Sequence, residues 1–395
     1  MTNIAQGFVG ERLTEARRSR GISGADLADL INVSVQSISK YENNHQSPKM
    51  DVLHRLATQL KFPYDYFLRS IPTIDEKPIF WRSRFSAPTV ARERAAVRLE
   101  WMKEVVDYIA TYFDLPTLNI PQIDFPNDGI IDSDFIERTA SEIREHWQIR
   151  SGPMPDTIEY METNGILISR IHVRAEKIDA FSQWSGRFGL PFVVLARDKS
   201  SAVRQRFDAL HELIHIVIHA NIPQRRLNDR AFYKMIEKQA DQIASAMLLP
   251  DYEFTSELYA PTLDGFLTLK ERWGASVGAM IMRCKSLEIL DDDSAKRLWI
   301  NYNRRRWRNG EPFDNKIVKE EPQLIRRSFE MLIEEGVQSP SEILKALPFP
   351  PLDLEELADL EQGTLSGIIP SRALPEFKNE YRRDLNVVNI FEGKN

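Results

Sequence analysis

Three histidines lie within nine residues of one another in the stretch 207–219, and two of them belong to an H-E-x-x-H motif. His211 and His215 are four residues apart, so on an α-helix both imidazoles leave the same face. Two such imidazoles can bind one metal ion, and Glu212 beside them can take a proton from a water activated by that metal. The motif is expected by chance on the order of 0.01 times in a chain of this composition, so it indicates a metal site.

A catalytic zinc site needs a third protein ligand. The chain has one cysteine, Cys284, so histidines and carboxylates must supply the ligands. His219 lies about 12 Å from His211 along a straight helix and cannot share the ion without a break in that helix. Proteases with H-E-x-x-H-x-x-G-x-x-H use a glycine for this break, but the chain has Ile218 there and Asn221 in the place of the third histidine. We therefore expect His219 to pack behind a ligand.

The helix expected over residues 229–249 offers a better third ligand. Glu237 and Asp241 are four residues apart on one face of it, beside apolar residues. If this face packs against the metal helix, Glu237 points at the ion and Asp241 can orient a ligand histidine through its free ring nitrogen. From the residues alone, two solvated carboxylates explain the pattern about equally well.

The elements around these helices predict an α+β fold that is mostly helical. Short strands are expected at 166–171, 180–182 and 191–195, so a small sheet should flank the site, and its edge could pair with an extended substrate peptide. Residues 71–85 show no periodicity and are expected to be a linker that then docks. Further helices are expected over residues 88–113, 132–150, 155–164, 263–273, 276–287, 321–335 and 340–347.

The N-terminal seventy residues predict a set of short helices. Gly21 ends the first helical pattern, and Ser23 and Ser34 can cap the second and third helices. Two short helices joined by a tight turn form a helix-turn-helix, whose second helix enters the major groove of DNA.

The run SGADLADLINVSVQSISKYENN resembles the Cro/C1-type (XRE) helix-turn-helix family, and the continuation QSPKMDVLHRLATQL is similar to its fourth and fifth helices. The resemblance implies a five-helix DNA-binding domain over residues 1–70. It also implies that the start of the third helix reads base edges, where Gln36 can pair with adenine and Val35 can contact a thymine methyl. The other base-reading candidates are Ser37, Ser39 and Lys40, and the phosphate-binding candidates are Ser34, Asn43 and Lys49.

Charge gives DNA binding only modest support. Residues 1–70 carry nine Lys/Arg against seven Asp/Glu, and the whole chain has a net charge of −6. A helical module that binds protein instead of DNA is the alternative. A single copy with few base-reading groups would bind weakly, so we expect a homodimer if double-stranded DNA is the partner. The basic, aromatic stretch 301–310 is better explained as a solvated helix end than as a nucleic-acid patch.

The block RQRFDALHELIHIVIH followed by EKQADQIASAMLLP resembles the ImmA/IrrE family of zinc metallopeptidases. The segments IDAFSQW, LPFVVL and WGASVGAMIMRC are similar to that family as well. The resemblance covers roughly residues 130–310 and implies a zincin-like domain with one zinc ion per chain. It implies His211, His215 and Glu237 as ligands and Glu212 as the catalytic base. Family members usually carry glycine before the second histidine, where this chain has Ile214.

These resemblances imply four regions: a DNA-binding domain at 1–70, a helical linker at 71–129, a zinc metallopeptidase domain at 130–310 and a helical C-terminal extension at 311–395. The implied function is a DNA-binding regulator that cleaves a specific repressor or antitoxin-like protein. The alternative is a non-proteolytic transcriptional regulator whose zinc domain senses a signal or binds a partner. Candidate oxyanion stabilisers are Tyr233, Arg204 and Arg206.

The sequence also predicts a cytoplasmic protein. The N-terminus lacks a basic region followed by an apolar core, so no secretion signal is expected. Apolar runs stay well short of the roughly 20 residues that a membrane-spanning helix needs.

Overall fold

The computed structural model describes residues 5–72, 77–82, 87–173, 178–197 and 201–367. The N-terminal part contains α1 (Gly10–Arg20), α2 (Gly24–Leu30), α3 (Val35–Glu42), α4 (Met50–Leu60) and a 3₁₀ helix, η1 (Tyr64–Leu68). Gly21 adopts the left-handed conformation that ends α1. The hydroxyls of Ser23 and Ser34 accept the backbone N–H groups of Asp26 and Ser37, so both serines cap their helices as predicted.

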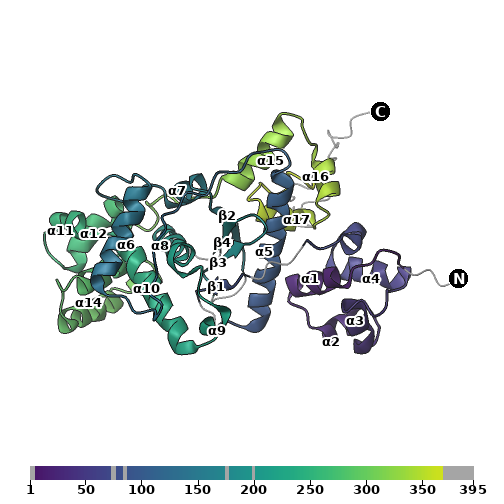
Figure 1. Ribbon diagram of the computed structural model, residues 1–395, viewed down its shortest axis with the longest axis horizontal. Helices are drawn as coiled ribbons and strands as arrows, with labels where there is room; N and C mark the ends of the chain where they lie inside the picture. Colours follow the sequence, from purple (N-terminus) through teal and green to yellow (C-terminus); the bar gives the residue numbers. More distant parts are fainter. Residues whose placement is uncertain (1–4, 73–76, 83–86, 174–177, 198–200, 368–395) are drawn as a thin grey trace, which may run out of the picture.

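A four-stranded sheet lies at the centre of the molecule (Figure 1). Its strands are β1 (Ile79–Trp81), β2 (Leu167–Ile171), β3 (Ala180–Ser185) and β4 (Leu190–Ala196), in the order β1-β3-β4-β2. β2 and β4 are parallel, whereas β3 is antiparallel to both β4 and β1. Three strands match the predicted ones. β1 was not predicted, because it lies in the stretch expected to be a linker.

Two helices carry the predicted metal ligands. α8 (Ala202–Ile214) follows β4 and continues into a π-helical turn, η2 (His215–His219). After the short α9 (Gln224–Leu227), α10 (Arg230–Leu248) returns alongside α8 and ends just before Pro250. The two helices bury apolar faces in one core, to which Leu210, Ala240 and Ala244 belong.

The other helices surround this unit (Figure 1). α5 (Thr89–Ile109) lies between the N-terminal helices and the sheet, and the helices of residues 324–357 lie beside it. The remaining elements are α6 (Ser133–His146), α7 (Thr157–Thr163), α11 (Asp251–Glu257), α12 (Leu263–Trp273), α13 (Val277–Ser286), α14 (Asp292–Arg304), the 3₁₀ helix η3 (Trp307–Asn309), α15 (Leu324–Glu334), α16 (Pro340–Ala346) and α17 (Pro351–Leu357).

Alternation along the strands divides the buried residues into two large cores. In β4, Phe192 and Val194 face a core shared with the N-terminal helices, α5 and the C-terminal helices. Val193 and Leu195 face the core that contains α8 and α10. The sheet therefore connects the N-terminal helices to the metal-ligand helices through its two faces. In the described part of the chain, no helix is long and apolar enough to cross a membrane.

Candidate metal centre

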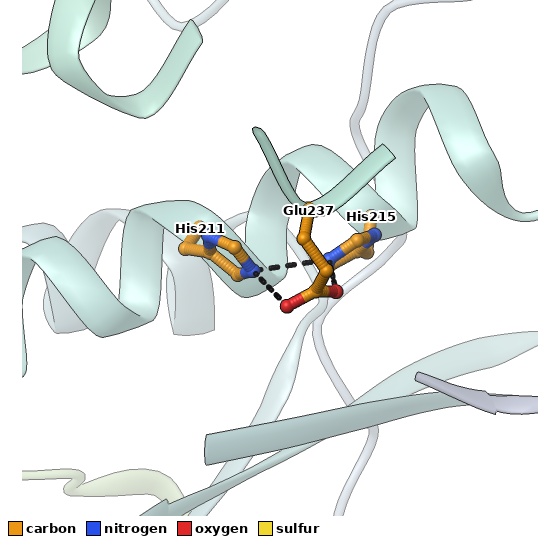
Figure 2. A group of neighbouring side chains, drawn as sticks. All are labelled: His211, His215 and Glu237. Carbon is orange, nitrogen blue, oxygen red and sulfur yellow. Dashed lines mark hydrogen bonds and ion pairs between the residues drawn. The ribbon is translucent and has the colours of Figure 1, made fainter. Parts of the chain in front are cut away.

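His211, His215 and Glu237 converge on one point between α8 and α10 (Figure 2). The Nε2 atoms of the two histidines lie 3.1 Å apart. Glu237 Oε1 lies 3.0 Å from His215 Nε2, and Glu237 Oε2 lies 3.6 Å from His211 Nε2. His211 comes from the last turn of α8, His215 is the first residue of the π-helical turn that follows, and Glu237 reaches across from α10.

The three side chains fit a metal ion. Tetrahedral zinc with ligands at about 2.0–2.1 Å separates its ligand atoms by about 3.3 Å, which matches the distances above. Glu237 Oε1 is buried and has no hydrogen-bond partner, although an imidazole nitrogen lies beside it. A buried carboxylate oxygen without a partner is costly, and a cation between it and the imidazoles removes that cost. In the described residues this is the one His/Cys/Asp/Glu cluster that could hold a metal ion.

The second ring nitrogen of His211 and of His215 also has a polar partner. His211 Nδ1 lies 2.9 Å from Asp241 Oδ1, and His215 Nδ1 lies 2.9 Å from His219 Nδ1. Such contacts fix the ring orientation and the tautomer of a metal-binding imidazole. His219 is fully buried in the π-helical turn and is not part of the ligand cluster.

The electrostatics of the cluster favour a positive charge. Burial opposes protonation of His211, as does the charge of Arg82, but hydrogen bonds with Asp241 and Glu237 outweigh both and raise the His211 pKa to about 9. Burial alone would raise the pKa of Glu237 and of Asp241. Their interactions with the histidines outweigh this effect, so the pKa of each carboxyl is lower than its ordinary value. A site that holds a proton so firmly is also suited to a metal cation.

Glu212 is fully buried beside the ligands. The Ser182 hydroxyl, from β3, donates a 2.6 Å hydrogen bond to Glu212 Oε2, while Glu212 Oε1 has no hydrogen-bond partner. Burial raises the pKa of Glu212, although the two histidines and the Ser182 hydrogen bond lower it. One carboxylate oxygen is thus fixed by the sheet, and the other is available to accept a proton.

Sequence reasoning missed the segment that covers the site. The Phe80 ring stacks on the His215 ring, with centroids 5.0 Å apart and an interplanar angle of 18°. Arg82 pairs with Asp208 and lies 3.6 Å from Asp241 Oδ1. The only advance signal was the run of large apolar residues at positions 79–81, which is too short to show a period.

Of the three suspected oxyanion stabilisers, Tyr233 is buried on the ligand helix, one turn before Glu237. Its hydroxyl lies 2.7 Å from both the amide nitrogen and the carbonyl oxygen of Trp81.

The two arginines suspected as oxyanion stabilisers bind other parts of the chain. Arg204 pairs with Asp179, and Arg206 binds the carbonyls of Met154 and Pro155.

Most of the predicted DNA-contacting residues are exposed and lie on α3 or at its ends, whereas Lys49 precedes α4. The N-terminal part of α3 presents Val35 and Gln36 to solvent, and Ser37 is half-buried. The Ser34 hydroxyl is used by the cap, and the Asn43 amide donates to the Ser39 carbonyl at 2.7 Å. Ser39, Lys40 and Lys49 are exposed as well.

Comparison with known proteins assigns both parts of the chain. Residues 161–285 match the model of the peptidase M78 family, described as the IrrE N-terminal-like domain, and this segment contains both ligand helices. The chain carries an IrrE N-terminal-like domain. Residues 13–67 match a helix-turn-helix family model and precede the IrrE-like domain. The helix-turn-helix supports DNA binding, and the IrrE-like domain places the His/Glu cluster within a peptidase family.

One relative shares part of this architecture. The HTH-type transcriptional regulator ImmR of Bacillus subtilis (strain 168) is 32% identical over 60 residues, which make up 15% of this chain and 47% of ImmR. The chain thus spans less than half the length of that relative.

Proposed function

We propose that the chain is a DNA-binding regulator whose IrrE-like domain is a zinc-dependent endopeptidase. The observation that carries the proposal is the buried His211–His215–Glu237 cluster with the partner-free oxygen of Glu212 beside it. A purely structural metal site needs no such base. The substrate we infer is a specific protein, such as a repressor or an antitoxin-like protein.

The chemistry follows from the positions of the side chains. A bound zinc ion would supply Lewis acidity, which lowers the pKa of water towards about 7 and polarises a peptide carbonyl. Glu212 takes the proton of the attacking water on Oε1 and passes it to the leaving amine, while Ser182 holds Oε2 in place. Tyr233, whose hydroxyl already binds a main-chain carbonyl, is the side chain we assign to stabilise the oxyanion.

Metal content tests the ligand set. We expect about one zinc per chain in the purified protein, and strongly reduced zinc in both His211→Ala and Glu237→Ala. Glu334→Ala, at the end of the distant α15, is the matched control and should keep the parent's zinc. Zinc lost in His211→Ala but kept in Glu237→Ala would contradict the assignment of the third ligand.

Catalysis is tested separately by Glu212→Gln. This change should abolish cleavage of the protein substrate and leave zinc and DNA binding at parent levels, because Glu212 is not a ligand in the proposal. If Glu212→Gln regulates transcription as the parent does, the non-proteolytic alternative holds. Cleavage that survives the change would contradict the assignment of the base.

A further inference from the structure

β1 runs along the edge of β3 nearest to the metal cluster. Phe80 lies opposite Ser182 in this antiparallel pair, and Ser182 is the residue that holds Glu212. Without β1, the outermost strand on this side would be β3, because the sheet order is β1-β3-β4-β2. β1 thus occupies the sheet edge next to β3, the strand whose Ser182 holds the candidate base.

The side chain of Phe80 fills an apolar pocket next to the ligands. It is 2% exposed and packs in a small cluster separate from the two large cores. Its ring stacks on His215, so it shields one ligand from solvent. Ile79 and Trp81, the neighbours of Phe80, belong instead to the core on the other face. The other buried members of the cluster are Ile222, Leu227, Tyr233 and Ile236.

The main chain of β1 is held in the way a bound peptide would be. The Trp81 amide donates to the Tyr233 hydroxyl, and the same hydroxyl donates to the Trp81 carbonyl, both at 2.7 Å. Tyr233 lies one turn from Glu237 on the same helix, so this peptide group lies near the ligand cluster. Edge-strand pairing, one side-chain pocket and a hydroxyl on the main chain are the features of β-strand peptide recognition.

We propose that β1 occupies the substrate cleft of the peptidase. The substrate is then an extended peptide segment that pairs antiparallel with β3 and places a large apolar side chain, preferably aromatic, in the Phe80 pocket. This inference rests on the proposed endopeptidase function. It adds a preference for a type of substrate and a resting state in which β1 fills the cleft. Cleavage requires β1 to leave, because His211, Glu212 and His215 are at most 1% exposed while it is in place.

Two features make displacement feasible. β1 has only three residues, and so short a strand adds little stability by itself. Its face away from the metal cluster also borders a cavity of about 600 Å³ between α1 and α5, to which Ile79 and Trp81 contribute. Displacement must separate Trp81 from the core on that side, but part of β1 there faces open space and not packed side chains.

Peptide binding tests the proposal without any need for catalysis. The probe is the synthetic hexapeptide Lys-Pro-Ile-Phe-Trp-Arg, which repeats residues 77–82, and its control replaces Phe by Ala. The host is the full chain with Glu212→Gln, with or without Phe80→Ala. With Phe80 present, the resident strand competes at an effective concentration on the order of mM, so the peptide should bind weakly. The host with Phe80→Ala should bind the peptide about thirtyfold more tightly than it binds the control peptide.

Ile79→Ala is the matched control variant, because its side chain lies in the same strand but faces the opposite core. It should leave peptide binding as weak as in the parent. Equal binding of both peptides to the Phe80→Ala host, or no binding to it, would overturn the inference. Absence of cleavage even in a Phe80→Ala variant that keeps Glu212 would contradict the proposed function and leave this binding result unaffected.

If Phe80→Ala does not fold, a different variant can test whether β1 covers the zinc site. Tyr233→Phe keeps the ring and removes the hydroxyl that holds Trp81. A chromophoric chelator should then remove zinc from the loaded protein several-fold faster than from the parent. A removal rate equal to that of the parent would contradict a covering role for β1.

Discussion

His215 and His219 face each other through their Nδ1 atoms, 2.9 Å apart, in a π-helical turn. Because both are Nδ1 atoms, one of them must carry the proton and the other must accept it. If His215 binds zinc through Nε2, its own proton lies on Nδ1 and His219 is the acceptor. His219 then has to be neutral, which agrees with the burial and the charges of His215 and His211 that lower its pKa well below the ordinary value.

His219→Ala should therefore weaken zinc binding without removing a ligand. Loss of the acceptor frees the His215 ring to rotate and to change tautomer, and such changes cost about 10–100-fold in metal affinity. The measurement is competition for zinc with a chelator of known affinity. The exposed His146→Ala should bind zinc as the parent does. If both variants match the parent, His219 only fills space.

Zinc affinity should depend on pH through His211. Its pKa of about 9 in the metal-free protein exceeds the ordinary value of 6.5, so between these values zinc must displace a proton from His211. The affinity should rise about tenfold per pH unit in this window from His211 alone and level off above about pH 9. The folding stability of the metal-free protein changes with pH in the opposite direction. The stability that protonated His211 contributes is complete below about pH 6.5 and is lost as the pH rises through about 9.

The test uses Asp241→Asn, because the Asp241 carboxylate is one of the groups that raise the His211 pKa. The pH at which the affinity levels off should move down in this variant. Titrations at several pH values between 6.5 and 10 would measure it. An unchanged levelling pH in Asp241→Asn would contradict the role of this contact.

The sequence made the local parts of the site predictable. His211 and His215 are linked by helical spacing, so geometry within one helix was enough to pair them. Glu237 lies on the next long helix with a clear apolar face, but its choice as the third ligand came from the family resemblance. The caps at Ser23 and Ser34 are equally local. The histidine pair and the two caps depend on residues no more than about one turn apart.

The rest depends on pairings that sequence periodicity does not encode. Phe80 meets Ser182 across a register between segments about a hundred residues apart, and a three-residue strand has no period to detect. The Ser182–Glu212 hydrogen bond likewise joins a strand to a helix. Sequence reasoning thus named the residues that the structure brings together as candidate metal ligands, but not the segment that covers them.

DNA recognition should depend on Gln36. Its side chain is exposed at the start of α3, where a recognition helix contacts base edges. Selection from random-sequence duplexes should give an enriched motif with the parent, and Gln36→Ala should lose the preference at one position, at a cost of about 1–3 kcal/mol. Gln46→Ala, exposed but outside α3, should select the parent's motif. No enrichment with the parent at low salt would favour a protein partner for this domain.

Two ion pairs join α1 to α5, and they should differ in their contribution to stability. Arg12 and Glu104 are buried, with Nη1 and Oε1 2.7 Å apart, whereas Arg18 and Glu93 are exposed and 3.7 Å apart. Glu104→Gln leaves a buried guanidinium short of a partner and should lower the free energy of unfolding by about 3 kcal/mol. Glu93→Gln should change it by less than about 1 kcal/mol.

Urea denaturation followed by fluorescence would measure both changes, since Trp101 on α5 lies in the same core as the N-terminal helices. Trp101 donates to the Tyr66 hydroxyl of η1, so its emission should also report separation of the N-terminal helices from α5. A Glu104→Gln variant as stable as Glu93→Gln would mean that apolar packing alone holds the DNA-binding domain against α5. A large loss confined to Glu104→Gln would mean that the buried pair contributes to holding the DNA-binding domain against α5.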